Sequence, residues 1–397
     1  MESTHGTLEP TGDVAEFTVV AFGGLCSVFA LIGVVSSLYG PLLIAFSHRF
    51  AVSIPQAGEV LSVHFVGALL GVTGAWGGVR RTTGRHVLHA SLAALALGAL
   101  AATLAHNWDL FLAAVFVVGL GFGGLDFSLN TLLTRSAEVG RARRLSVANA
   151  GYGVGAVVGP LLVALLHPSR FTALFAGVAT LSIALVLLTR GVSASRLRTS
   201  PSRRAQRRPD RRAILSVFVA AYVCYVAVET ASSGWIATQL RHESYSTTVA
   251  SLVTAGFWGG LALGRALGGP LHRHVGARAL VLGGLVAAVL LVGAAEYRPF
   301  APWTYGLTGL VLASVFPMGL LWYTELCPGD VDGIALMILT MMAGGVIGPG
   351  AESLAVTLGS VHVVPVVIVA FALADLAAFG LATRYRALPT VAPATLL

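Results

Sequence analysis

Long apolar runs separated by short polar turns occupy almost the whole sequence. A helix needs about 20 predominantly apolar residues to cross a bilayer, and runs of roughly that length recur along the chain. Within hydrocarbon each backbone amide and carbonyl must find a partner inside the protein, so these runs are expected to be α-helices. Twelve runs qualify, near residues 18–46, 55–77, 87–105, 110–134, 145–166, 171–189, 213–238, 248–270, 279–295, 303–325, 332–358 and 362–383. We therefore predict an all-α membrane protein with twelve transmembrane helices.

Composition agrees with this class and argues against others. The 397 residues are 56% hydrophobic and 11% charged, whereas about 25% of the residues of a soluble domain are charged. The net charge of +8 does not indicate a nucleic-acid partner, because all 25 basic residues are arginines and most lie in the turns. The three cysteines, Cys26, Cys224 and Cys327, lie far apart in apolar runs and predict neither a disulfide framework nor a metal site. The polar N-terminus has no basic region, so the first run is expected to remain as a helix.

The distribution of arginine predicts the orientation of the chain. The loops after the even-numbered spans and the C-terminal tail hold 20 arginines, and the loops after the odd-numbered spans hold four. Cytoplasmic loops carry the excess of basic residues in membrane proteins. We therefore predict a multi-pass protein of the cytoplasmic membrane with both termini in the cytoplasm.

One long polar stretch divides the chain. Residues 192–212 are rich in Ser, Pro and Arg, which is typical of a flexible linker. Its arginines are expected to be solvated near anionic lipid, with specific phosphate or lipid binding as the alternative. The predicted domains are an N-terminal six-helix bundle at 1–191, this cytoplasmic linker, and a C-terminal six-helix bundle at 213–397.

The two halves share features that indicate an internal repeat. The turn at 77–85 and the turn at 269–278 both combine glycines with a trailing arginine, at an offset of 192 residues. A Gly-Pro pair closes a glycine-rich stretch at 159–160 and again at 348–349. Parallel repeats related by an axis along the membrane normal are a transporter architecture, with the substrate site at their interface near mid-membrane.

Those two turns resemble the signature loop of the major facilitator superfamily, G-x-L-x-D-R-x-G-R-R. The glycines and the trailing arginine match, whereas Arg81 and Arg273 stand where that family usually has Asp. The glycines still permit a tight turn and close helix approach. The resemblance implies two pseudo-symmetric six-helix bundles that rock about a central site.

Longer stretches resemble the fucose:proton symporter branch of that superfamily and its relatives. These stretches are GLGFGGLDFSLN in span 4, GVGAVVGPLL in span 5, YVAVETASSGW in span 7, FWGGLALGR in span 8, and VFP followed later by GGVIGP. In that symporter an acid in span 4 works with an acid in span 1. Asp126 matches the first position, but span 1 of this chain has no carboxylate, which argues against fucose as the substrate.

Asp126 is the first candidate for a functional residue. It lies roughly sixteen residues into span 4, with Asn130 one turn further on. An ionisable side chain in hydrocarbon costs roughly 3 kcal/mol or more, so such a residue marks a functional site by default. We expect Asp126 to exchange a proton and Asn130 to contact substrate; a structural hydrogen bond to a neighbouring helix is the alternative for Asp126.

Glu229 is the counterpart of Asp126 in the second half. It lies in the middle of span 7 with Tyr225 one turn before it and Trp235 after it. An acid beside aromatic rings suits a sugar, which offers both hydroxyls and apolar C–H faces. We expect Glu229 to bind a proton or substrate hydroxyls, and Tyr225 and Trp235 to contact substrate. A structural role for Glu229, and an interfacial anchor for Trp235, are the alternatives.

Further candidates fall in other spans. Arg265 in span 8 must be paired or snorkel to the cytoplasmic surface, and we expect a gate or a structural salt bridge. Glu352 is expected to be a gate near the outer end of span 11. His64, Asn149 and Trp258 are further candidates for substrate contact, although a lone histidine in an apolar helix is more often a core residue.

These features predict a secondary active transporter that moves a small polar, sugar-like solute by alternating access, coupled to protons. A proton-driven exporter of a drug or secondary metabolite is the alternative, because Gly155, Gly159 and Pro160 resemble part of an antiporter motif, G-x-x-x-G-P. A receptor or scaffold without transport activity would call for a folded soluble domain. No enzyme constellation and no phosphate-binding Gly-Lys motif occurs. We expect a monomer in contact with lipid, without cofactor or metal.

Overall fold

A computed structural model describes residues 15–134, 141–166, 168–193 and 209–386. Within these ranges, twelve helical segments are long and apolar enough to cross a membrane. The predicted all-α membrane fold is confirmed. The predicted linker at 192–212 lies outside the described residues for most of its length.

The first half of the chain contains six long helices. They are α1 (Val19–Phe50), α2 (Ile54–Arg81), α3 (Gly84–Leu104), α4 (Trp108–Thr134), α5 (Arg141–Leu166) and α6 (Phe171–Leu188), with the 3-10 helices η1 (Pro168–Arg170) and η2 (Thr189–Gly191). Short strands β1 (Glu16–Phe17) and β2 (Val192–Ser193) pair antiparallel and join the start of α1 to the end of α6.

The second half repeats this order with one interruption. Its elements are α7 (Arg211–His242), α8 (Thr247–Val275), α9 (Ala277–Ala294), α10 (Ala301–Leu312), α11 (Val315–Leu326), α12 (Val331–Leu358), η3 (Val361–Val363) and α13 (Val364–Ala382). The predicted span 303–325 is divided into α10 and α11. Pro317 has no N–H to bond the carbonyl of Ala313, so the helix is interrupted one turn before the proline.

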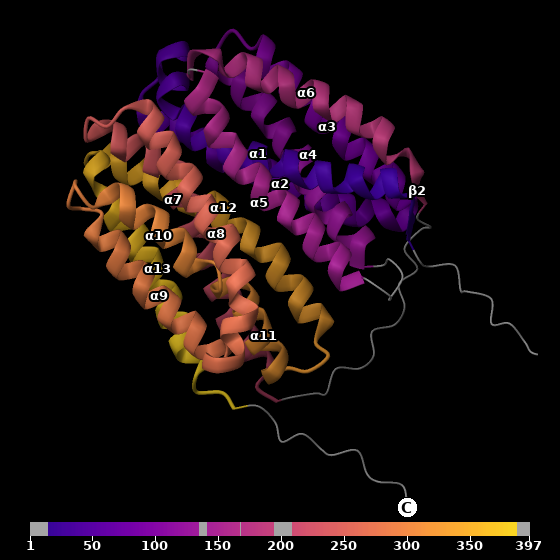
Figure 1. Cartoon of the computed structure of the whole chain (residues 1–397), viewed down its shortest axis with the longest axis vertical. Coiled ribbons are helices and arrows are strands. Elements are labelled where there is room, and N and C mark those ends of the chain that lie inside the picture. The colour runs from indigo at the N-terminus through magenta and orange to yellow at the C-terminus, as the bar shows by residue number, and fades with distance from the viewer. Residues whose placement is uncertain (1–14, 135–140, 167, 194–208, 387–397) are drawn as a thin grey trace, which may run out of the picture.

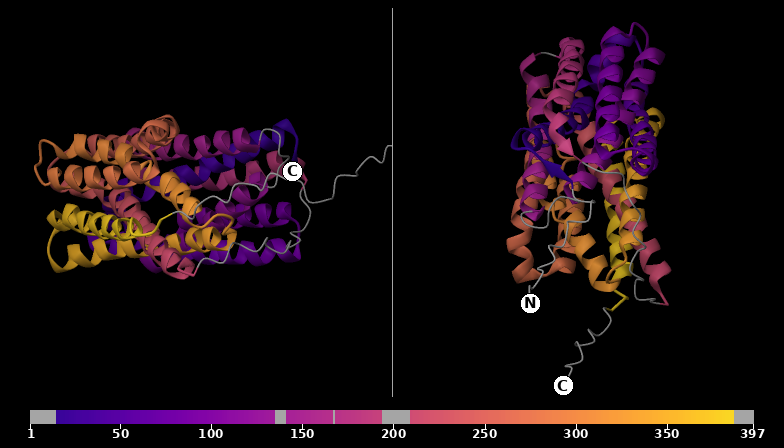
Figure 2. Two further views of the ribbon diagram at one scale, coloured as in Figure 1. Left: turned by 90° about the horizontal axis from the view of Figure 1, so that it is seen from below. Right: turned by 90° about the vertical axis from the view of Figure 1, so that its right-hand side faces the viewer.

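The two halves form two bundles with matching internal packing. The helices of α1–α6 lie beside those of α7–α13, and in Figure 1 both sets run obliquely from upper left to lower right (Figures 1 and 2). In the first bundle α1 packs on α5, α2 on α4, and α3 on α6. In the second bundle α7 packs on α12, α8 on α10, and α9 on α13. The same three pairs of spans are therefore in contact in each half, as a repeat requires.

Between the bundles, α2 packs against α12, α5 against α8, and α1 against α7. Glycines permit this approach: a Cβ on Gly40 would meet the backbone of Ser233, and one on Gly58 would meet the ring of Trp235. We call the end of the molecule with the turn between α1 and α2 the outer end, in keeping with the predicted orientation. The opposite end, where α6 ends and α7 begins, is the inner end.

Candidate functional site

An ion pair between α7 and α8 forms the centre of the candidate site. Arg265 Nη2 lies 3.5 Å from Glu229 Oε2, and the Tyr225 hydroxyl donates to the same oxygen at 2.6 Å. Tyr225 and Glu229 are four residues apart, so both project from one face of α7. The Glu229 side chain is 14% exposed and that of Arg265 38% exposed. Arg265 thus has a partner inside the protein, one of the two arrangements expected for it.

Tyr152 of α5 connects this ion pair to the other bundle. Its hydroxyl donates to Ser36 Oγ of α1 at 3.0 Å. Its ring lies edge-on to Trp258 of α8, with ring centroids 6.3 Å apart. The hydroxyl is also within electrostatic reach of Glu229, Arg265 and Asp126. The Tyr152 hydroxyl is therefore near charged groups of both bundles.

Asp126 of α4 supplies a carboxyl group to this region from the N-terminal bundle. Asn130 Nδ2 donates to Asp126 Oδ1 at 3.2 Å and to its backbone carbonyl at 2.9 Å. Among the residues that the structure describes, no cation pairs with Asp126. The carboxyl is half-buried and lies within electrostatic reach of Tyr152, so it faces the protein interior. The two acids thus differ in their partners: Asp126 accepts from the amide of Asn130, whereas Glu229 pairs with the guanidinium of Arg265.

The other four expected site residues differ in their surroundings. His64 is packed among aromatic rings: its Nδ1 lies 3.2 Å from the Tyr39 hydroxyl, and its ring centroid lies 4.9 Å from that of Phe122. Asn149 is exposed, and its side-chain amide donates to the Leu145 carbonyl of its own helix. Trp235 is buried at the contact between the bundles, toward the outer end. Glu352 is buried toward the same end, where the sequence predicts a gate.

Tyr152 and Ser36 were not identified from the sequence. Tyr152 lies in a glycine-rich stretch whose pattern of small residues predicts only close helix packing. It is the one aromatic residue of the predicted span 145–166, and an aromatic hydroxyl amid glycines was the available signal. Ser36 offered none, because serine is common in membrane helices and bonds readily to its own backbone, as Ser36 does to the Gly33 carbonyl.

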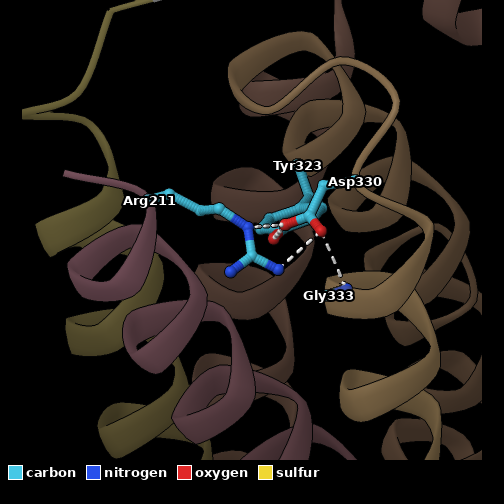
Figure 3. Close-up of polar contacts among 4 residues, drawn as sticks. All are labelled: Arg211, Tyr323, Asp330 and Gly333. Carbon is cyan, nitrogen blue, oxygen red and sulfur yellow. Dashed lines mark hydrogen bonds and ion pairs between the residues drawn. The ribbon is translucent and has the colours of Figure 1, made fainter. Parts of the chain in front are cut away.

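A second polar cluster lies at the inner end of the C-terminal bundle (Figure 3). Arg211, at the start of α7, donates to both carboxylate oxygens of Asp330 at 2.7 Å. The Tyr323 hydroxyl and the Gly333 backbone amide also donate to Asp330. Burial raises the pKa of the Asp330 carboxyl, but the hydrogen bonds from Arg211, Tyr323 and Gly333 outweigh burial and hold its pKa below its ordinary value. The loop after span 10 contains acidic residues and no arginine, and Arg211 of α7 provides the cation that pairs with Asp330.

Within the described ranges, no group of three or more His, Cys, Asp or Glu side chains could hold a metal ion. The polar groups of the central site are instead hydroxyls, one amide, two carboxyls and one guanidinium. Such a set can bind a polar solute and exchange a proton.

Comparison with known proteins gives the fold a family context. The sequence pattern of the Major Facilitator Superfamily matches residues 25–294. No curated protein matches the chain. Among solved structures, a bacterial homolog of the human lysosomal transporter Spinster, in an inward-facing and occupied conformation, superposes with a TM-score of 0.75 at 15% identity, covering 92% of this chain and 96% of that one.

Two further solved structures show the same fold. The E. coli fucose:proton symporter FucP, in the outward conformation, has a TM-score of 0.64 at 18% identity, covering 92% of this chain and 99% of that one. The nucleoside transporter NupG has a TM-score of 0.73 at 13% identity, covering 91% and 99%.

Proposed function

Because this chain belongs to the major facilitator superfamily, we propose that it is a secondary active transporter that couples the movement of a small polar, sugar-like solute to protons. The observation that carries this proposal is the Glu229–Arg265 ion pair within the membrane spans, with Tyr152 and Asp126 of the other bundle within electrostatic reach of one another. Charges are rare and costly within membrane spans, and they mark substrate and proton pathways.

Asp126 is the proposed site of proton exchange. A carboxyl without a cation nearby is stable in a dry interior when it is protonated, and it ionises where water or a cation reaches it. Glu229, in contrast, has Arg265 and Tyr225 to stabilise its charge. Loss of the proton from Asp126 would place a second negative charge near Tyr152 and draw Arg265 toward the N-terminal bundle. Protonation of Asp126 is thereby coupled to the relative position of the bundles.

The groups around this site suit a solute with both hydroxyls and apolar faces. Tyr152 and Tyr225 offer hydroxyls, Asn130 offers an amide, and Trp258 offers an aromatic ring beside Tyr152. Aromatic side chains combine apolar surface with a polar group, a combination that matches sugars and similar compounds. Two of the transporters with this fold are named for fucose and for nucleosides, which are compounds of this kind.

The packing between the bundles supports an inward-facing state. Ser62 Oγ donates to the Val346 carbonyl, and Ser353 Oγ donates to the Pro55 carbonyl, so α2 and α12 are joined toward the outer end. The fold is also more similar to the inward-facing Spinster homolog than to FucP in its outward conformation. With the termini in the cytoplasm, the central site would open to the cytoplasm in this state.

Transport in proteoliposomes tests the proposal. We expect solute uptake to respond to an imposed pH gradient in the parent protein, and Asp126→Asn to abolish that response while leaving downhill movement of solute. Asp109→Asn is the matched control, because Asp109 is an exposed carboxylate on the same helix. Flux that ignores the gradient in the parent, or that responds equally in Asp126→Asn, would refute proton coupling through Asp126.

An exporter of a drug or secondary metabolite is the second candidate. Its support is the small-residue face of α5, where a Cβ on Gly155 would meet the Ala30 backbone and one on Gly159 would meet Ser37 of α1. This face contains the part of the sequence that resembles the antiporter motif. The same vesicles separate the two candidates. A symporter accumulates solute inside the vesicle when protons flow in, whereas an exporter that exchanges solute for protons accumulates solute inside only when protons flow out.

A further inference from the structure

A seam between α2, α7 and α12 closes the outer end of the interface between the bundles. Ser62 Oγ donates to the Val346 carbonyl at 2.9 Å, and Ser353 Oγ donates to the Pro55 carbonyl at 2.5 Å. Within the same seam, a Cβ on Gly58 would meet the ring of Trp235. We call this contact the outer seam. It joins α2 of one bundle to α7 and α12 of the other.

Glu352 of α12 lies in the outer seam. It follows Gly345, which faces Phe65 of α2, by seven residues, and Gly348, which faces Ala227 of α7, by four. Residues seven and four apart lie on nearly the same side of a helix. Glu352 therefore points into the wedge between α2 and α7.

The Glu352 side chain is fully buried, and neither carboxyl oxygen has a hydrogen-bond partner in the described part of the chain. Buried polar groups in folded proteins are almost always hydrogen-bonded, so an exception calls for an explanation. An ionised carboxylate in such surroundings would be very costly without a partner. Glu352 therefore carries its proton while the seam is closed.

Other titratable groups on the helices around Glu352 do not supply a counter-ion. On α2, His64 contacts Tyr39, and Glu59 is exposed. On α7, Glu229 pairs with Arg265, and Glu243 accepts a hydrogen bond from Gln239. Arg241, at the exposed end of α7, donates to the Tyr245 carbonyl. His242 is also exposed, and its ring contacts that of His362 of η3.

Two more titratable groups lie near these helices. Asp375 of α13 is a buried acid without a partner among the described residues, and it cannot balance a negative charge. The Tyr305 hydroxyl of α10 is within electrostatic reach of Glu352, but it donates to Gln239. A neutral carboxyl is thus the form that fits the closed seam.

A donor in the seam is also unsatisfied. Trp235, packed against Gly58, has an indole Nε1 without a partner among the described residues. One motion explains both unsatisfied groups. If the bundles separate at the outer end, water reaches the Trp235 indole and the Glu352 carboxyl and hydrogen-bonds to each. The closed seam would then be one of two states that these side chains occupy.

We propose that Glu352 is a second proton-binding site, separate from Asp126, which takes a proton from the outer side as the outer seam closes. The proton moves from water to a carboxylate oxygen of Glu352 before the seam excludes water, and it returns when the seam opens. The closed state then holds one proton more than the open state. Low outer pH favours closure, and the open-to-closed ratio rises by up to about tenfold per pH unit above the range where the exposed carboxyl titrates. This inference rests on the proposed alternation of the two bundles.

Distance measurements between spin labels test the proposal. His106 and Ser360 are exposed at the outer end, one in each bundle. Both are changed to cysteine after Cys26, Cys224 and Cys327 are changed to serine, and nitroxide labels are attached. Double electron–electron resonance on protein in nanodiscs, from pH 5 to pH 8, reports the fraction with the short, closed-seam distance. We expect that fraction to fall as pH rises.

The variants assign the effect to one residue. Glu352→Gln is expected to stay closed at every pH, because its side chain is always neutral. Asp375→Asn is the matched control, another buried acid without a described partner, and it should follow the parent. A pH response that persists unchanged in Glu352→Gln, or a parent without any response, would overturn the proposal. In Asp126→Asn the fraction with the closed seam should still fall as pH rises, although proton-driven flux is lost. The flux assay therefore tests the proposed function, and the distance measurement tests this inference separately.

Discussion

At the scale of single residues, the ion pair between Glu229 and Arg265 makes the sharpest prediction. Removing one partner leaves the other charge without compensation, which costs about 3–5 kcal/mol in a fully buried pair. Because the Arg265 side chain is 38% exposed, solvent reduces this cost, and we expect Arg265→Gln to lose roughly 1–3 kcal/mol. Thermal unfolding of the purified protein, followed by tryptophan fluorescence, measures the loss.

The double variant provides the control for this ion pair. Glu229→Gln combined with Arg265→Gln removes both charges, so we expect it to recover most of the stability that either single change loses. If the losses of the two single variants add in the double variant, the two side chains act independently, and their pairing does not stabilise the contact between α7 and α8.

Charged residues of the site could be predicted from the sequence, whereas the environment of the others could not. Asp126, Glu229 and Arg265 stand out because a charge inside an apolar run is rare. Position along a span gives depth but not direction: His64 is a candidate for substrate contact by its depth, and its ring packs against Tyr39 and Phe122. The Tyr152 side chain points toward the site, and its hydroxyl donates to Ser36 of α1, but a glycine-rich sequence does not predict which helix that hydroxyl contacts.

At the scale of elements, the Arg211–Asp330 pair fixes the starts of α7 and α12 relative to each other (Figure 3). The folded state holds the pKa of Asp330 below its ordinary value. A carboxyl of this kind adds stability above its unfolded pKa, near 3.9, and that stability is lost as pH falls through the lower folded value. We expect Asp330→Asn to lower stability by roughly 1–3 kcal/mol at pH 7.

Unfolding as a function of pH checks this assignment. The difference between the parent and Asp330→Asn should be constant from pH 6 to pH 8 and should shrink below about pH 4. Asp332→Asn is the control, since Asp332 is an exposed acid at the start of the same helix. A difference that persists unchanged at pH 3 would contradict a role for the ionised carboxylate.

Helix positions follow from apolar length, but helix breaks do not follow from proline alone. Pro41, Pro160, Pro270 and Pro349 all lie inside unbroken helices. Pro317, in contrast, follows the break between α10 and α11. A helix tolerates a proline when neighbouring helices and side chains satisfy the freed carbonyl, and that depends on the tertiary structure. The sequence therefore predicted one span at 303–325 and could not predict its interruption.

At the scale of the whole molecule, the two bundles are joined toward the outer end, and transport requires that contact to open. A Cβ on Gly350 would lie 3.2 Å from Ser62 Oγ across the outer seam, which suits the geometry of a disulfide. In a background without the native cysteines, Ser62→Cys with Gly350→Cys should form a cross-link under oxidation. Solute flux should then stop and return after reduction.

A cross-link inside one bundle distinguishes blocked rocking from local damage. A Cβ on Gly268 of α8 would lie 4.0 Å from the Cβ of Ser314, between α10 and α11, and both residues belong to the C-terminal bundle. This spacing suits a disulfide. Gly268→Cys with Ser314→Cys should therefore cross-link without stopping flux, because rigid-body rocking leaves contacts within a bundle unchanged. If the Ser62–Gly350 cross-link forms fully and solute still moves at the reduced protein's rate, the outer seam does not open during transport. In that case access to Asp126 and Glu229 would have to arise from motion within a bundle.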